Sequence, residues 1–154
     1  SLDSGPILLQ QRLVLNQTET AGKLLQETAD LGAKLLLQVL KELEYEKAIH
    51  PVTQNHFQAS YTQKLTKEMA RVDWRKSATQ LHREIRAFNP WPVSFFENHG
   101  QNIRIWEADV QKALVKEKPG TIVQANADGI VIATGEGTLT LKQLQFPGKK
   151  TQSV

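Results

Sequence analysis

The chain has 154 residues, of which 40% are hydrophobic and 23% are charged, and its mean hydropathy is −0.40. This composition is typical of a water-soluble globular protein, and its apolar runs are far shorter than the roughly 20 residues of a membrane-spanning helix. The absence of cysteine excludes disulfides, thiolate metal ligands and a cysteine nucleophile. We therefore expect a cytoplasmic protein with no membrane partner.

The positive charge lies in the second part of the chain. Residues 1–65 contain 6 Lys and Arg against 7 Asp and Glu, a net charge of −1, whereas residues 66–154 contain 13 against 9, a net charge of +4. A basic excess of this size suits a phosphate-bearing partner without requiring one. The four histidines are scattered and have no metal-ligand spacing, so we expect no metal.

The first 66 residues predict a strand, a long helix and a linker. Residues 6–15, PILLQQRLVL, are predicted as a strand that follows a tight turn at Asp3 to Pro6. From about Thr20 to Glu46 apolar residues recur at steps of three and four, which predicts a helix. This pair is half of a βαβ unit, so we expect its sheet to extend upstream. Residues 47–66 have no periodicity and are interpreted as a connection between domains.

The remaining residues predict a helix followed by five strands. The helix carries Ala78, Leu81, Ile85 and Phe88 on one face, with Ser77 as its expected N-cap. RAFNPWP, residues 86–92, ends it because a residue before proline is disfavoured in the α conformation. The stretches VSFFEN, NIRIWEA, TIVQA, IVIAT and TLTLKQLQF then alternate with glycine-containing turns. We predict an α+β fold whose C-terminal part is a small barrel like that of oligonucleotide-binding proteins, closed or partly open.

Two groups of residues are candidates for function. Asp3 is either a turn residue or an active-site carboxylate on a loop beside a strand. Basic side chains form either a phosphate-contacting surface or a solvated face; the candidates are Lys64, Lys67, Arg71, Arg75, Arg86, Lys149 and Lys150, with Lys76 and Arg83 nearby in sequence. The tryptophans at 74, 91 and 106 are more consistent with packing than with stacking on bases.

Several stretches resemble one family when they are taken together. LDSGPILLQ, YTQKLTKEMARVDW, IRAFNPWP, IRIWEA and KPGTIVQANADGIVIATGEGTLTLKQLQFPGKK are similar, in this order, to the C-terminal part of bacterial methionyl-tRNA formyltransferase. The resemblance implies an enzyme that transfers a formyl group from 10-formyltetrahydrofolate to methionyl initiator tRNA in translation initiation. It implies a monomer, with no metal.

The resemblance also assigns parts of the chain. It implies that residues 1–46 are the end of a Rossmann-like formyltransferase domain, 47–65 the interdomain linker and 66–154 most of the tRNA-binding barrel domain. Asp3 falls on the aspartate of the family's D-x-G loop, which acts in catalysis with an upstream Asn and His. We expect a chain truncated at both ends, with most of the folate site and the Asn and His outside it, and inactive by itself.

Three alternatives remain open from the sequence. The first is a related folate-dependent enzyme, such as a 10-formyltetrahydrofolate dehydrogenase or a sugar-nucleotide formyltransferase. The second is a non-catalytic RNA-binding or tRNA-binding module, whose binding would weaken steeply with salt. The third is a plain structural domain, with basic residues scattered instead of clustered.

Overall fold

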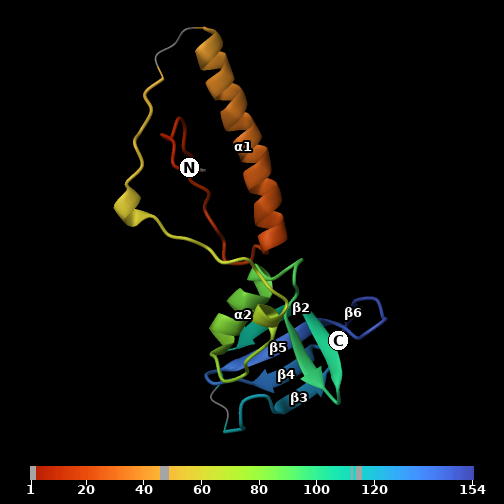
Figure 1. Ribbon diagram of the computed structural model, residues 1–154. Coiled ribbons are helices and arrows are strands. Elements are labelled where there is room, and N and C mark those ends of the chain that lie inside the picture. Colours follow the sequence, from red (N-terminus) through yellow and green to blue (C-terminus); the bar gives the residue numbers. More distant parts are fainter. Residues whose placement is uncertain (1–2, 46–48, 112, 114–115) are drawn as a thin grey trace. The chain divides into compact units, whose positions relative to one another are not determined.

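The computed structural model describes residues 3–45, 49–111, 113 and 116–154, which divide into two compact units (Figure 1). Unit 1 comprises the described residues of 1–19 and 23–64, and unit 2 comprises residues 20–22 and the described residues of 65–154. In the described part of the chain, no helix is long and apolar enough to cross a membrane. The assignment of residues 1–46, 47–65 and 66–154 to two domains and a linker stays a prediction.

Most of the helix α1 (Ala21–Glu44) belongs to unit 1, and this helix confirms the predicted one. Its sequence is rich in Ala, Leu, Lys, Gln and Glu, the residues with the highest helix propensity. Side-chain pairs four residues apart support it: Lys23 Nζ lies 3.8 Å from Glu27 Oε1, and Gln38 Nε2 donates to Glu42 Oε1 at 2.9 Å. Five leucines of the helix, at 25, 36, 37, 40 and 43, are exposed.

The strand predicted over residues 6–15 is wrong. Residues 9–15 have no regular structure, and the segment forms a single bridge, in which the amides of Ile7 and Val52 each donate to the other's carbonyl at 2.8 and 2.9 Å. A strand needs a neighbouring ladder for its backbone groups, and the described residues of unit 1 supply one bridge only. Residues 49–64 are irregular apart from the short 3₁₀ helix η1 (His56–Gln58).

Unit 2 contains an antiparallel sheet of six strands. They are β1 (Phe95–Asn98), β2 (Gln101–Gln111), β3 (Ile122–Asn126), β4 (Gly129–Ala133), β5 (Thr138–Gln145) and β6 (Gln152–Ser153). Their order is β1-β2-β5-β4-β3, and β6 pairs with β5. The five predicted strands are confirmed as β1 to β5, and the prediction missed β6.

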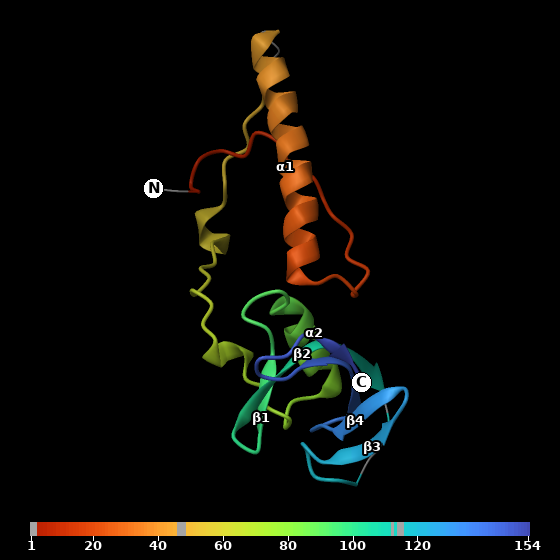
Figure 2. The ribbon, with the colours of Figure 1, turned by 90° about the vertical axis from the view of Figure 1, so that its right-hand side faces the viewer.

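The mixed helix and sheet class is confirmed, whereas a closed barrel is not observed. Among the described residues no pairing joins β1 to β3, and these strands lie at opposite ends of the sheet order (Figure 2). Side chains from outside the sheet cover its apolar face instead: Leu81 and Ile85 belong to the buried core, and Trp74 packs against it. The sheet therefore does not need closure to bury its core.

The helix α2 (Ala78–Ala87) packs against β2 and β5, and the 3₁₀ helix η2 (Glu68–Ala70) precedes it in the chain. Ser77 is its N-cap, as predicted, with Oγ accepting from the amide of Gln80 at 3.3 Å. Leu81 and Ile85 are 1% and 2% exposed because they occupy the face turned to the sheet.

RAFNPWP ends α2 as predicted. The amide of Phe88 still donates to the backbone carbonyl of Glu84 at 2.9 Å, as in a helix. The amide of Val93 donates to the Phe88 carbonyl at 2.9 Å, across the turn. Asn89 Nδ2 donates to the carbonyl of Trp106 in β2 at 3.1 Å, which holds the turn against the sheet. The expectation that Trp91 packs is wrong: its side chain is 53% exposed because it lies in the surface turn that follows the helix.

Candidate functional site

Asp3 lies on an exposed loop of unit 1. Its φ is +59°, in the left-handed region, which aspartate tolerates better than most residues. Gln54 Nε2 donates to the carbonyls of Asp3 and Gly5 at 2.9 and 2.6 Å, so the backbone of the loop is held by a distant segment. The carboxylate itself is exposed. Its predicted catalytic role stays a prediction.

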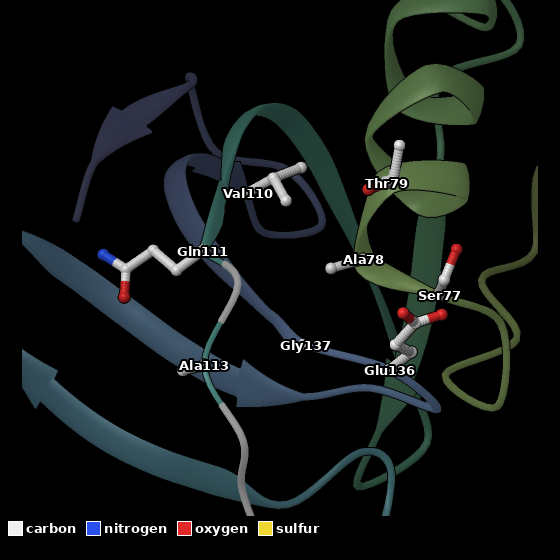
Figure 3. A pocket seen from close by; sticks show the side chains of 8 residues that line it. All are labelled: Ser77, Ala78, Thr79, Val110, Gln111, Ala113, Glu136 and Gly137. Atoms are coloured by element: carbon white, nitrogen blue, oxygen red, sulfur yellow. The ribbon is translucent and has the colours of Figure 1, made fainter.

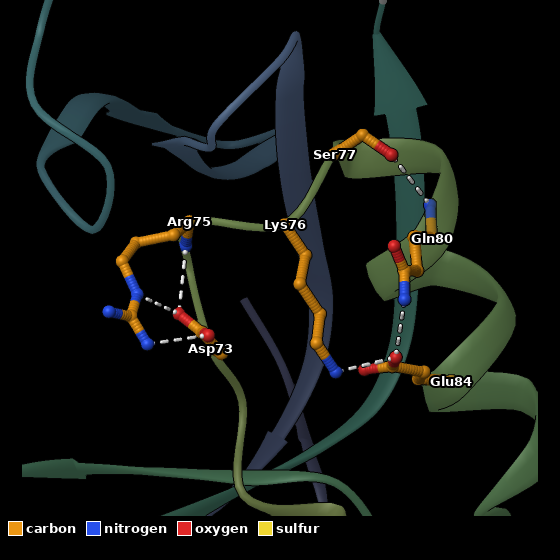
Figure 4. A network of polar contacts seen from close by, with 6 residues as sticks. All are labelled: Asp73, Arg75, Lys76, Ser77, Gln80 and Glu84. Atoms are coloured by element: carbon orange, nitrogen blue, oxygen red, sulfur yellow. Dashed lines mark hydrogen bonds and ion pairs between the residues drawn. The ribbon is translucent and has the colours of Figure 1, made fainter.

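A polar network leads into α2 (Figure 4). Arg75 Nε and Nη2 donate to the two carboxylate oxygens of Asp73 at 2.8 and 2.9 Å, and these bonds lower the pKa of Asp73 to about 2. Lys76 Nζ contacts Glu84 Oε1 at 2.7 Å, and Gln80 Nε2 donates to the same carboxylate at 3.2 Å. The charges of Arg75 and Lys76 are thus matched by neighbouring carboxylates.

The turn between β4 and β5 docks onto the start of α2. The amide of Gly135 donates to the carbonyls of Trp74 and Lys76 at 2.9 and 3.0 Å. The amide of Ala78 donates to the backbone carbonyl of Glu136 at 2.8 Å. A Cβ at Gly135 would lie 1.8 Å from the Arg75 carbonyl oxygen, so this approach requires glycine. Gly135 and Gly137 lie in this turn, which is one of the predicted glycine-containing turns, and Gly135 also allows a tertiary contact.

One pocket of about 370 Å³ lies beside this junction (Figure 3). Its lining residues are Ser77, Ala78, Thr79, Val110, Gln111, Ala113, Glu136 and Gly137. The Ser77 hydroxyl is already used in the helix cap, and the formal charge on the described lining is the Glu136 carboxylate. This carboxylate disfavours an anionic group beside it.

A polar groove of about 480 Å³ lies at another edge of the sheet. Its lining residues are Gly100, Gln101, Asn102, Arg104, Gln145, Phe146, Pro147 and Gly148. Gln145 Oε1 accepts from Arg104 Nη1 at 3.4 Å and from Trp106 Nε1 at 3.1 Å, and its Nε2 donates to the carbonyl of Lys149 at 3.0 Å. One neutral side chain thus links β2 to the basic turn after β5.

An apolar pocket of about 370 Å³ opens beside this groove, and Phe146 lines both. Most of its lining is aliphatic or aromatic and comes from the core, with Trp74 and Phe96 in edge-to-face contact at 5.7 Å between ring centroids. Glu97 and Asn98 contribute polar groups. The groove and the pocket together form the candidate binding site of unit 2.

The seven predicted basic residues are divided between the two units, and their role in binding stays a prediction. Lys64 belongs to unit 1 and the other six belong to unit 2. Arg71 contacts Glu68 at 2.9 Å and Glu97 at 3.6 Å, with its guanidinium 5.6 Å from the Phe95 ring centroid, and Lys67 lies at the cap of η2. Arg86 lies in the last turn of α2 and, after the effect of burial, contributes to lowering the pKa of His82.

Lys149 and Lys150 are exposed in the turn that continues the polar groove. Sequence reasoning named both lysines but missed Arg104, Gln145 and Phe146. The sequence carried only a weak signal for Arg104. It lies between Ile103 and Ile105 in an alternating pattern, which indicates that it faces outward, but its partner Gln145 is 41 residues away.

The described residues contain no group of three or more His, Asp or Glu suited to a metal ion.

Unit 2 is a small α+β domain in which a capped helix packs on an open antiparallel sheet. A family profile described as "Formyl transferase, C-terminal domain" matches residues 64–154, which is more than half of the chain. The chain belongs to this family.

Solved structures with the same fold include HypX from Aquifex aeolicus in complex with tetrahydrofolic acid, with a TM-score of 0.64 and 18% identity. Others are the N-formyltransferase from Helicobacter canadensis in complex with folinic acid and dTDP-3-aminofucose (0.67, 16%) and the sugar 3N-formyltransferase WlaRD (0.65, 16%). They match 99%, 92% and 97% of this chain. The chain spans 26% of HypX, and 51% and 52% of the other two chains.

Proposed function

We propose that the chain is the C-terminal part of a methionyl-tRNA formyltransferase and that unit 2 holds the tRNA. The membership of residues 64–154 in the formyltransferase C-terminal family supports a one-carbon transferase. The observation that carries the choice of tRNA is the charge of this same part, which is net +4 over residues 66–154. A polyanionic substrate is favoured by such an excess, which acts through counterion release.

In this proposal the whole enzyme transfers a formyl group from 10-formyltetrahydrofolate to methionyl initiator tRNA. The neutral amino group attacks the formyl carbon, the new C–N bond forms, and the bond from that carbon to folate N10 breaks as N10 takes up a proton. Asp3 assists removal of the amine proton. We assign folate binding mainly to other parts of the enzyme, as the resemblance to the C-terminal part of this enzyme implies.

The binding part of this proposal is tested with the 154-residue chain and fluorescently labelled initiator tRNA. Binding should be saturable and should weaken steeply as salt rises, and the Lys149→Ala/Lys150→Ala variant should bind several-fold more weakly. The matched control is Lys116→Ala/Lys118→Ala, which removes the same charge from the connection between β2 and β3. Lack of tRNA binding at low salt would contradict the proposal.

The catalytic part requires an enzyme that contains this chain together with a formyltransferase domain. Asp3→Asn should lower kcat by about 10²-fold or more, in the range expected for loss of a general acid–base group, with tRNA binding unchanged. Equal activity of the variant and the parent would remove Asp3 from the mechanism.

A second candidate is a folate-dependent enzyme that formylates a sugar nucleotide. The likeness of the fold to the Helicobacter canadensis enzyme and to WlaRD favours it. Under this alternative, the chain would bind tRNA no better than an unrelated protein of equal charge, and the whole enzyme would formylate an amino sugar nucleotide.

A further inference from the structure

We propose that the candidate site of unit 2 binds one unpaired RNA nucleotide, with its base in the apolar pocket and its phosphates along the polar groove. The site lies at the edge formed by the β1–β2 turn and the segment that follows β5. The inference deepens the proposed function, on which it rests for RNA as the ligand, by naming where and how unit 2 makes contact.

Arg104 is the charged residue in the described lining of the groove, and Lys149 and Lys150 follow this lining directly in the chain. Arg104 donates to the neutral Gln145 at 3.4 Å, and no ion pair of the described residues includes Arg104, Lys149 or Lys150. This contrasts with Arg71 and Arg75, whose guanidinium groups contact carboxylates at 2.8–3.6 Å. An anion would therefore gain more by approaching the groove than by approaching the arginines before α2.

The groove is also preorganised. Gln145 accepts from Arg104 and Trp106 through one oxygen and donates to the Lys149 carbonyl through its nitrogen. The amide of Lys149 returns to the Phe146 carbonyl at 3.0 Å, which closes the turn that presents both lysines. Fixing these groups before a ligand arrives reduces the entropy lost on binding.

The adjoining pocket offers surfaces suited to a flat, largely apolar group. Phe146 and Ile122 line it while remaining 40% and 60% exposed, so a base could contact them without displacing the core. Asn98 lines it as well, and its amide offers both donors and an acceptor to a base edge. The Glu97 carboxylate in the lining is partly compensated by Arg71 at 3.6 Å.

The shared Phe146 is the reason to treat the groove and the pocket as one site. A nucleotide has an anionic phosphate close to an aromatic base. The polar groove and the apolar pocket are likewise next to each other, so they could hold these two parts of one nucleotide. A base paired within a duplex would keep its faces stacked on neighbours, so the proposal requires an unpaired nucleotide.

The test uses the 154-residue chain and a labelled eight-nucleotide RNA with no self-complementarity, followed by fluorescence anisotropy at several salt concentrations. Arg104→Gln/Lys149→Ala should weaken binding about tenfold. It should also make the slope of log affinity against log salt concentration shallower by about 1.4, because each of the two lost phosphate contacts contributes roughly 0.7. Phe146→Leu should weaken binding about fivefold with an unchanged salt slope, because it removes stacking and no charge. Lys116→Ala/Lys118→Ala should change binding less than twofold.

Amide chemical shifts distinguish a local effect from unfolding. Each variant should keep the dispersed spectrum of the parent chain, and the RNA should shift the amides of residues 98–104 and 145–149 more than those of α2. Equal weakening by the groove variant and the Lys116→Ala/Lys118→Ala control, or shifts centred on α2, would overturn the inference. Equally tight binding of a blunt RNA duplex of the same length would also overturn it.

The outcomes for the two proposals are separable. If initiator tRNA binds but the eight-nucleotide RNA does not, the unpaired-nucleotide site is wrong and the proposed function stands. If the short RNA binds at the groove but tRNA does not bind, the proposed function is wrong and the site stands. If a lipid vesicle or an acidic peptide binds at the groove and RNA does not, the inference is wrong in its ligand class.

Discussion

Gly135 shows how one residue position governs the packing of unit 2. Its φ is not in the left-handed region, so its requirement for glycine comes from space alone: the Arg75 carbonyl oxygen would lie 1.8 Å from an added Cβ. The same backbone approach lets its amide donate to Trp74 and Lys76. A side chain at this position must push the β4–β5 turn away from the start of α2.

We expect Gly135→Ala to lower the free energy of unfolding by about 2 kcal/mol or more, as forced overpacking does. Gly148→Ala is the matched control in unit 2, because Gly148 has φ +68° and no heavy atom within 4 Å of the added Cβ. The control should cost about 1 kcal/mol through backbone strain alone. Urea unfolding measures both, and equal losses would contradict the steric explanation.

Asp73 provides a prediction for pH. Hydrogen bonds from the Arg75 side chain, then from its backbone amide, lower the pKa of Asp73 from 3.8 to about 2. Because the folded-state pKa is depressed, the associated stabilisation is present above about pH 4 and is lost as the pH falls from about 4 to about 2. The carboxylate is exposed, so the effect on stability is small.

The carboxyl ¹³C shift of Asp73 should therefore titrate near pH 2 in the parent chain. In Arg75→Gln the midpoint should move upward, but not fully to 3.8, because the backbone amide of residue 75 still donates at 3.1 Å. An unchanged midpoint would show that the side-chain pair does not form in solution.

At the scale of elements, α2 is held by a cap at one end and by core packing along its length. Ser77 Oγ accepts from the amide of Gln80 at 3.3 Å, which is a long hydrogen bond. Leu81 is 1% exposed and belongs to the core formed with β2 and β5. We therefore expect the cap to contribute less to the free energy of unfolding than the burial of Leu81 does.

We expect Ser77→Ala to cost about 0.5–1 kcal/mol, at the low end for an N-cap. Leu81→Ala should cost about 2–5 kcal/mol, because it leaves a cavity between α2 and the sheet. Denaturant unfolding of unit 2 compares them directly. A larger loss for Ser77→Ala than for Leu81→Ala would mean that the helix is not held mainly by its buried face.

At the scale of the whole molecule, the chain consists of two units with separate internal contacts. Unit 2 contains the connected core of buried side chains, whereas unit 1 leaves five leucines of α1 exposed. Residues 49–64 of unit 1 are irregular apart from η1 and the bridge between Val52 and Ile7. Stability should accordingly reside in unit 2.

A fragment of residues 65–154 should therefore unfold cooperatively with nearly the stability of unit 2 in the complete chain. A small loss is expected, because the amide of Gly22 donates to the Asn89 carbonyl at 2.9 Å and the fragment lacks this bond. Calorimetry of the fragment and of the complete chain makes the comparison. A fragment without a cooperative transition would show that residues 1–64 are needed for folding.

Sequence determined the features that depend on local physics. Alternating apolar residues located β1 to β5, steps of three and four located both helices, and Ser77 and RAFNPWP bounded α2, because caps and prolines act within a few residues. The stretch at 6–15 failed because a strand also needs a partner, which local pattern does not supply. The functional candidates Lys149 and Lys150 were visible as charges, but not as parts of a groove.

Only the tertiary structure decided which distant residues meet. β5 lies between β2 and β4, so Gln145 comes within reach of Arg104 and Trp106, and the turn that bears Lys149 is tied to both. The open sheet, the contact at Gly135 and the position of Phe146 in the lining of both the groove and the pocket also depend on contacts between distant residues. Strand order and register follow from the packing of the whole core, so no short stretch of sequence contains them.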